Sequence, residues 1–273
     1  METPFERKLQ DAILHERVTL GSMPSVVAKI SAAAGRQDIT ARELANELLA
    51  DPVLAGRLLR VANSSRYRGS QPVTKLQLAI ARLGLPVACK LVLTLALSHA
   101  VKPSHPELRS RLAQQWKHSI EVAAMSRVLA DHYADVDPEE AFLAGLVHRI
   151  GVLPIINMAD QMPGTAIRLD ILDKSIRTWQ AKVGSLLLRT WHFPPTLVGV
   201  CLDVENPHRD HPGPADVSDL VFVALHQVGA TTVESLDVTQ TPAWQKLGLD
   251  AAQGLVLGVD VDEQIEEARS LLE

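Results

Sequence analysis

Helix start signals recur along this chain, and no sustained alternation of apolar and polar residues competes with them. Thr40 and Glu43 have the spacing of a capping box, and Asp51-Pro52 and Asp137-Pro138 each place an N-cap before a proline at the first helical position. Apolar residues then follow at helical spacing, as at Leu54, Leu58 and Val61. The aromatic content of 4% also favours helices, because strands are enriched in aromatic residues. We therefore predict an all-α globule of ten or more short helices.

A polar break from Lys102 to Pro106 is expected to separate two groups of helices. Residues 18–102 would form an N-terminal helical subdomain, and residues 107–230 a second one packed intimately against it. Residues 1–17 would be a helical extension, and residues 231–273 an acidic tail with short helices. A helix from Thr74 should end at Gly84. Further helices are expected at about 107–132, 153–160, 175–190, 195–202, 214–229 and 262–272, with the run from 254 to 261 ambiguous.

The net charge of -5 is unevenly distributed. Residues 51–110 hold nine Lys or Arg and two acidic residues, whereas the remainder holds 18 basic and 30 acidic residues. The basic segment could attract an anion or an acidic protein partner, or it could simply keep exposed helix faces solvated. The negative charge of the whole chain disfavours nucleic acid as a partner.

Cysteine usage and hydropathy suggest a cytoplasmic protein without a membrane span. Cys89 and Cys201 both lie in apolar surroundings, which is typical of free buried thiols in a reducing compartment. The most apolar stretch, Leu91–Leu97, is far shorter than the about 20 residues that cross a bilayer. The charged N-terminus also lacks the apolar core of a signal peptide.

An apolar helix is predicted to end in the polar pair His148-Arg149, which follows the run AFLAGLV at 141–147. The arginine side chain has five donors, no acceptor and a permanent positive charge. It therefore cannot ligate a divalent cation and would repel one. Neither cysteine has a partner at zinc-site spacing, and no glycine-rich phosphate loop is present in the sequence.

Several motifs, taken in order, resemble those of the HDOD family. They are LGSMPSVV at 20–27, ADPVLAGRLLRVANS at 50–64, LAIARLGL at 78–85, WKHS at 116–119 and AFLAGLVHRIG at 141–151. The resemblance covers about residues 18–230. It implies the helical fold of HD-type metal phosphohydrolases without their full metal set. It also implies a regulatory, signal-transduction module of bacteria.

The resemblance further implies that the metal site of the catalytic relatives is broken here. Such a site needs a His, an adjacent His-Asp pair and a final Asp, and His118 and His148 match the two histidines. The paired Asp is replaced by Arg149, and the final Asp aligns with Leu225. Asp219 lies six residues earlier and therefore faces another side of a helix. We predict no metal, no cofactor and no catalysis.

Two interpretations remain for the pair of histidines. They could be inherited core histidines that are hydrogen-bonded to the backbone or to each other. Alternatively, His118, His148 and Arg149 could form a pocket in which the arginine supplies the charge of the lost metal. A guanidinium can hold a carboxylate or phosphate through two parallel hydrogen bonds, so a nucleotide-like anion could bind without being cleaved.

A second candidate surface lies in the basic segment, at Arg57, Arg60, Asn63, Arg66, Tyr67 and Arg68. An asparagine near a helix end most often serves as a cap or turn former. The alternative is that these residues form a docking patch for an acidic signalling protein.

Three functions are therefore compared. The first is a non-catalytic regulatory module that binds a protein partner or a small anion. The second is a phosphohydrolase with a rearranged site that uses carboxylates not identified from the sequence. The third and weakest is DNA binding through Thr40–Ser64, whose two capped helices imitate a helix-turn-helix.

Overall fold

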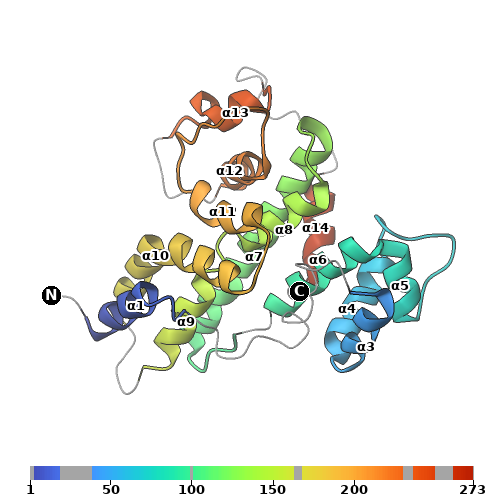
Figure 1. Cartoon of the computed structure of the whole chain (residues 1–273), viewed down its shortest axis with the longest axis horizontal. Helices are drawn as coiled ribbons and strands as arrows, with labels where there is room; N and C mark the ends of the chain where they lie inside the picture. The colour runs from blue at the N-terminus through green and yellow to red at the C-terminus, as the bar shows by residue number, and fades with distance from the viewer. Residues whose placement is uncertain are drawn as a thin grey trace.

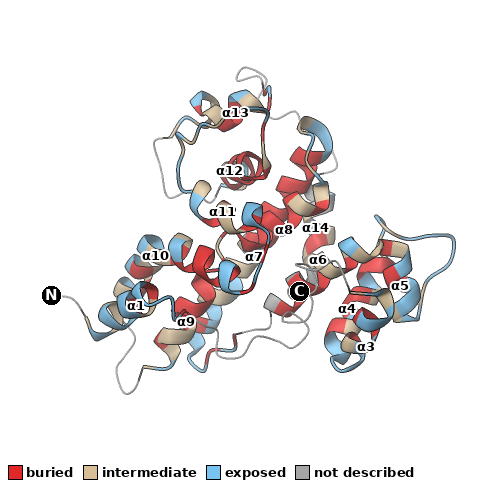
Figure 2. Ribbon diagram, in the orientation of Figure 1, coloured by how far each residue is buried: buried red, intermediate tan, exposed pale blue. Residues whose placement is uncertain are grey.

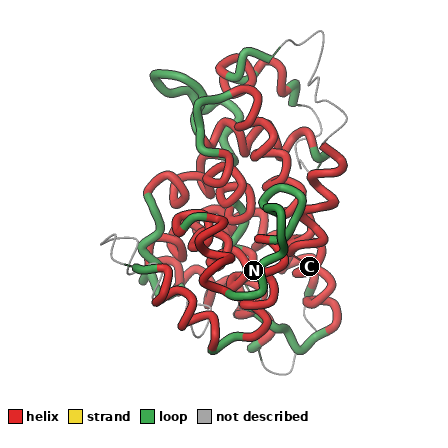
Figure 3. Tube along the Cα trace, turned by 90° about the vertical axis from the view of Figure 1, so that its right-hand side faces the viewer, coloured by secondary structure: helices red, strands yellow, loops and turns green. Residues whose placement is uncertain are grey.

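The computed structural model describes residues 3–18, 39–98, 101–162, 168–229, 236–249 and 261–272. Within these ranges every regular element is a helix (Figures 1 and 3), so the predicted all-α fold is confirmed. The helices of the N-terminal half are α1 Pro4–Leu14, α3 Ala41–Leu49, α4 Pro52–Ala62, α5 Leu76–Leu83 and α6 Leu85–Ser98. Those that follow are α7 Pro106–Tyr133, α8 Pro138–Val147, α9 Val152–Asp160, α10 Leu169–Thr190, α11 Pro195–Asp203 and α12 Val217–Gln227. The C-terminal part contains the 3-10 helix η1 Val238–Gln240, α13 Pro242–Lys246 and α14 Val261–Leu272.

The predicted helix starts form as the capping signals indicate. Before α3, the Thr40 hydroxyl accepts the Glu43 backbone N–H, and the Glu43 carboxylate accepts the Thr40 backbone N–H. Before α4, the Asp51 carboxylate accepts two backbone N–H groups at 3.1 Å. Asp137 caps α8 in the same manner. These bonds satisfy donors that the first turn of a helix leaves without a partner.

Several predicted boundaries shift. Helix α10 begins six residues before the expected 175, and α5 begins at Leu76 rather than Thr74. Helix α12 begins at Val217 rather than Pro214, because Asp216 forms a capping box with Asp219. The ambiguous run at 254–261 lies outside the described residues except for its last position.

The long helix α7 is the central element (Figure 1), and α8, α9, α12 and α14 all pack against it. Helices α8 and α12 are buried over most of their length, as Figure 2 shows. Because α8 and α12 also pack against each other, α7, α8 and α12 form the core of the molecule. Two of the three residues predicted to form a pocket, His118 and His148, lie on α7 and at the end of α8.

Helices α3, α4 and α5 pack on one another and form a group at the right of Figure 1. Gly84, at φ 78°, ends α5, and the chain turns by 109° into α6. Helix α6 then packs against both α4 and α8. One continuous apolar cluster includes residues on both sides of the break at 102–106, such as Leu58 and Leu146. The division into two subdomains at this break stays a prediction.

A smaller apolar cluster joins α1, α9 and α10 at the left of Figure 1. The extension at 1–17 is therefore helical and packed where it is described: Leu9 and Ile13 of α1 are buried against this cluster. One helical stretch, Pro138–Asp160, is long and apolar enough to cross a membrane, and 83% of its most apolar window is buried inside the protein. A core helix has the same property.

Two glycines bring the helices around His148 and Arg149 unusually close together. A Cβ atom on Gly145 would lie 2.5 Å from the Ala123 Cα atom of α7. A Cβ atom on Gly151 would lie 2.0 Å from the Gln180 carbonyl oxygen of α10. The turn that carries His148 and Arg149 is thus held between α7 and α10 at distances that only glycine permits.

Candidate functional site

His148 is fully buried at the C-terminal end of α8. Its Nδ1 atom lies 2.6 Å from the Gly145 carbonyl oxygen. Because a carbonyl oxygen can only accept, Nδ1 carries the proton, and Nε2 is an acceptor in the neutral ring. That Nε2 atom is buried and has no hydrogen-bond partner. Burial, together with the nearby positive charge of Arg149, lowers the pKa of His148 to about 3.

His118 lies beside it on α7. The two imidazole rings meet edge to face, with centroids 5.9 Å apart. The Nε2 atom of His118 is also buried without a partner, and its Nδ1 atom is 4.0 Å from a Glu121 carboxylate oxygen. Burial and the charge of Arg149 lower the pKa of His118 to about 4, although Glu121 opposes the shift. Both histidines are therefore neutral at physiological pH.

Arg149 supplies positive charge to the same region. Its Nε atom is buried and has no hydrogen-bond partner. Burial lowers the pKa of Arg149, and the carboxylate of Glu205 partly offsets this effect. A guanidinium stays protonated at neutral pH even so. The side chain is thus a half-buried cation whose buried Nε donor is unused, and leaving such a donor without a partner costs free energy.

A cavity of about 430 Å³ opens beside His118 and Arg149. Its polar lining residues come largely from α7, with Asp173 from α10, and its aliphatic ones come from α9 and α10. The lining residues are Arg111, Gln114, Gln115, His118, Arg149, Val152, Ile156, Asp173 and Ile176. Two of the three predicted pocket residues therefore line one cavity, and His148 lies behind His118. A volume of this size is typical of sites for small ligands.

The residues at this position do not fit a divalent cation. Leu225, predicted from the sequence to replace the final Asp of an HD-type site, is an apolar buried residue of α12. Arg149, predicted to replace the paired Asp, lowers the pKa values of both neighbouring histidines through its positive charge. The same field would repel a metal ion held by their Nε2 atoms.

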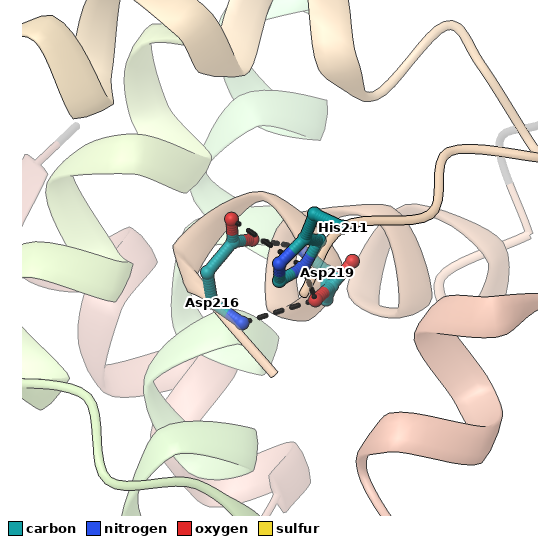
Figure 4. A group of neighbouring side chains, drawn as sticks. All are labelled: His211, Asp216 and Asp219. Atoms are coloured by element: carbon teal, nitrogen blue, oxygen red, sulfur yellow. Dashed lines mark hydrogen bonds and ion pairs between the residues drawn. The ribbon is translucent and has the colours of Figure 1, made fainter. Parts of the chain in front are cut away.

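A different group of side chains has the spacing of a metal site. The ligand atoms of His211, Asp216 and Asp219 lie within 4.8 Å of one another. Figure 4 shows these three side chains gathered together. The guanidinium of Arg209 already lies 2.6 Å from Asp216 and 3.2 Å from Asp219, however, so it neutralises much of the charge that a cation would meet. Among the described residues no other such group is found, and this one includes neither His118 nor His148.

The HDOD domain model matches residues 20–207. The chain belongs to the HDOD family. The matched range lies inside the predicted segment 18–230. Gly145, Gly151 and the pocket residues on α7–α10 all fall within the matched part of this HDOD chain.

Solved structures agree with this assignment. A "Putative metal-dependent phosphohydrolase" from Shewanella amazonensis has a TM-score of 0.80 at 20% identity, covering 98% of this chain and 97% of its own. An HDOD domain protein with unknown function from Geobacter sulfurreducens has a TM-score of 0.62 at 19% identity, with coverages of 96% and 95%. A "Putative signal transduction protein" from Marinobacter aquaeolei has a TM-score of 0.64 at 21% identity, with coverages of 98% and 64%. At these identities the likeness shows the shared fold. A comparison with the curated proteins gives no match.

In the second candidate surface, the side chain of Asn63 is hydrogen-bonded to neighbouring residues of the same chain. It is the C-cap of α4, and its side chain amide donates to the Val73 carbonyl oxygen and accepts the Val73 N–H, both at 2.8 Å. Arg82 also donates to the Asn63 amide oxygen. These bonds close the loop between α4 and α5, which is the local role that asparagine often has in turns.

The remaining members of the candidate docking patch separate into two groups. The Tyr67 hydroxyl donates to the Glu139 carboxylate at 2.5 Å, and Arg66 pairs with Glu139 at 3.4 Å. Arg57 is only 8% exposed and Tyr67 is half-buried, so these two side chains contribute little free surface. Arg60, Arg66 and Arg68 are exposed, although Arg66 is also paired with Glu139.

Sequence reasoning missed the pocket residues of α7 and α10. Arg111, Gln115 and His118 are spaced i, i+4 and i+7, so they share one face of a helix, and this pattern could have linked them to the histidine. Asp173 carries no comparable signal. It reaches the pocket only because α10 folds back beside α7, where its carboxylate pairs with Arg111 across 62 residues of sequence.

Proposed function

We propose that this HDOD chain is a regulatory module that binds a small anion at Arg149 and does not cleave it. The observation that carries the proposal is the half-buried guanidinium of Arg149, whose buried Nε atom lacks a partner and which lines a cavity of about 430 Å³. An oxyanion would satisfy both the charge and the free donor. The signal-transduction wording attached to a relative of similar fold agrees with a regulatory role.

The absence of cleavage is inferred from the chemistry of the same residues. Hydrolysis of a phosphate ester in a metal-dependent enzyme requires a cation that activates water. Arg149 can bind an oxyanion, but it offers no open coordination position and cannot lower the pKa of a bound water in that way. Neutral His118 and His148 could accept protons, yet neither has a carboxylate within hydrogen-bonding distance to form a catalytic pair.

Isothermal titration of the full chain tests the proposal. The probes are inorganic phosphate, adenosine 5′-monophosphate, the methyl ester of that nucleotide, and 2-naphthoate. At least one should bind, and Arg149→Met should weaken it by about tenfold or more, because a charge-assisted pair contributes about 1.5–3 kcal/mol. The matched control is Arg42→Met, which removes an exposed cation of α3 and should leave the affinity unchanged. Binding of none of the probes, or equal binding by the Arg149 variant, would contradict the proposal.

Two measurements distinguish our proposal from the alternative of a rearranged phosphohydrolase. If the chain were such an enzyme, elemental analysis of purified protein would find stoichiometric manganese, iron or zinc. Hydrolysis of bis(p-nitrophenyl) phosphate would be lost on chelation and restored by the same metal. Our proposal expects neither result.

A protein partner is the second candidate, favoured by the excess of basic residues at 51–110 and by the exposure of Arg60 and Arg68. Glu substitutions at both positions should weaken capture of an acidic partner without lowering stability, since both side chains are exposed. Arg57 is unsuitable for this test because it is buried. Unchanged capture would mean that these arginines only solvate the surface. DNA binding would show itself as a steep salt dependence with duplex DNA.

A further inference from the structure

The charges that line the pocket do not simply add to a strongly positive site. Arg111 is held by Asp173 through two parallel hydrogen bonds, Nε to Oδ1 at 2.9 Å and Nη2 to Oδ2 at 2.8 Å. This bidentate pair cancels one positive charge and fixes the planes of both groups. His118 is neutral. Arg149 is therefore the one cation without a matching carboxylate among the described lining residues.

Two carboxylates outside the lining act on its charged or titratable groups, and each also accepts a hydrogen bond from another side chain. Glu205, whose charge acts on Arg149, accepts a hydrogen bond from the side chain of Gln180. Glu121, whose charge acts on His118, accepts one from Arg269 of α14. Neither residue lines the cavity. The lining thus carries a net charge of one positive unit, and a carboxylate, Asp173, is part of its wall.

The aliphatic residues of the lining favour an apolar group. They are Val152 and Ile156 of α9 and Ile176 of α10; the first two are almost fully buried, so Ile176 offers most of the accessible aliphatic surface. Contact with these aliphatic side chains would remove apolar surface of a ligand from water. The amides of Gln114 and Gln115 add neutral hydrogen-bonding groups rather than charge.

Building on the proposed function, we propose that the ligand is an organic monoanion, and that Asp173 determines this specificity by rejecting a second negative charge. The recognised group is one carboxylate or one phosphodiester attached to an apolar or planar body. The anionic group pairs with Arg149, and the body lies against the aliphatic residues of the lining. A phosphomonoester dianion would place its extra charge in a pocket where Arg111 is already occupied by Asp173, and like charges in a partly enclosed site repel.

A matched ligand pair tests this selectivity on the full chain by isothermal titration at about pH 8. Adenosine 5′-monophosphate is a dianion there because its second phosphate pKa is about 6, whereas its methyl ester is a phosphodiester monoanion of nearly the same shape. 2-Naphthoate provides the carboxylate monoanion. We expect the methyl ester or 2-naphthoate, or both, to bind about tenfold tighter than the dianion. Whichever of these two ligands binds shows whether the recognised group is a phosphodiester or a carboxylate.

The variant Asp173→Asn should reverse the preference, because it leaves Arg111 unneutralised. The affinity for adenosine 5′-monophosphate should rise about tenfold or more, and the affinity for the methyl ester should rise less. The matched control is Asp170→Asn, the same change of charge on the same helix, at an exposed carboxylate that pairs with Arg168 outside the pocket. It should change neither affinity.

The outcomes separate the two proposals. If wild-type protein binds the dianion as tightly as the methyl ester, the inference about specificity is overturned while anion binding at Arg149 stands. If none of the probes binds, both proposals fail. If Asp170→Asn raises the affinity for the dianion as much as Asp173→Asn does, the effect comes from general charge, and Asp173 is not the specificity determinant. The comparison of the dianion with the methyl ester uses wild-type protein, so it tests the preference for a monoanion even if Asp173→Asn fails to fold.

Discussion

Acidification should destabilise this protein through His118 and His148 at pH values where most carboxylates are still ionised. Burial and Arg149 lower their pKa values from 6.5 to about 4 and about 3. In the unfolded chain both rings regain ordinary pKa values of about 6.5, so the unfolded chain binds protons at a higher pH than the folded one. Protons therefore favour unfolding. The stability is complete above about pH 6.5 and is lost as the pH falls from there towards the folded pKa values.

The magnitude follows from these values. At about pH 5, each histidine is almost fully protonated in the unfolded chain and almost fully neutral in the folded one. Proton binding to the unfolded chain is then favourable by about 2 kcal/mol per histidine relative to about pH 7.5. The two together remove about 4 kcal/mol from the free energy of unfolding, which is a large part of the total for an ordinary domain.

Urea denaturation of the wild type and of His148→Gln, each at about pH 7.5 and about pH 5, measures this contribution. The glutamine substitution also changes packing and hydrogen bonding at both pH values, so the quantity compared is the loss of stability on acidification. That loss should be about 2 kcal/mol smaller in His148→Gln than in the wild type, and similarly smaller in His118→Gln. His208→Gln, at an exposed turn residue, should lose as much as the wild type. An equal loss in all four proteins would refute the idea that the two pocket histidines are held neutral by the fold.

Two further substitutions test the packing around the site. Gly151→Ala should cost about 3 kcal/mol or more in the free energy of unfolding, since the new Cβ atom would lie 2.0 Å from the Gln180 carbonyl oxygen. Gly56→Ala, which meets nothing within 4 Å in α4, should instead be neutral or gain up to about 1 kcal/mol; equal effects of the two would contradict the close helix contact. Tyr67→Phe should cost about 2 kcal/mol by removing the donor to the buried Glu139 carboxylate. A change in urea midpoint equivalent to less than about 0.5 kcal/mol would show that this bond contributes little.

Local signals were enough to predict the helices, because each depends on residues close in sequence. The capping pair Thr40 and Glu43 and the N-cap Asp51 form the bonds that their spacing indicates. Gly84 ends α5 in a backbone conformation that glycine adopts without strain. The start of α12 was placed too early because Pro214 resembles a first-turn proline, while the bonds made by Asp216 start the helix three residues later.

The candidate site was predictable only in part, for a physical reason. His148 and Arg149 stand out because they end an apolar helix, where polar residues are costly, whereas His118 follows only from the resemblance to the HDOD family. Their partners across the cavity depend on how α7, α9 and α10 pack, and a single sequence does not encode that distance. The role of Asn63 illustrates the same limit, because its bonds to Val73 lie ten residues away, beyond a loop.

An arginine at position 149, where an HD-type site is expected to carry a carboxylate, has a different effect from simple loss of a ligand. A metal ion in a hydrolase binds the substrate oxyanion and also activates water, so one centre provides both recognition and reaction. Arg149 can provide the first without the second, since a guanidinium pairs with oxygen atoms but has no coordination position for water. The pocket volume, the aliphatic residues of the lining and the free donor of Arg149 are all compatible with this division. Under this proposal an anion would stay intact at the junction of α7, α9 and α10, and its pairing with Arg149 would stabilise the packed arrangement of these helices. Occupancy of the pocket would then be reported by the stability of the helix core, which gives the domain a physical means of responding to its ligand without cleaving it.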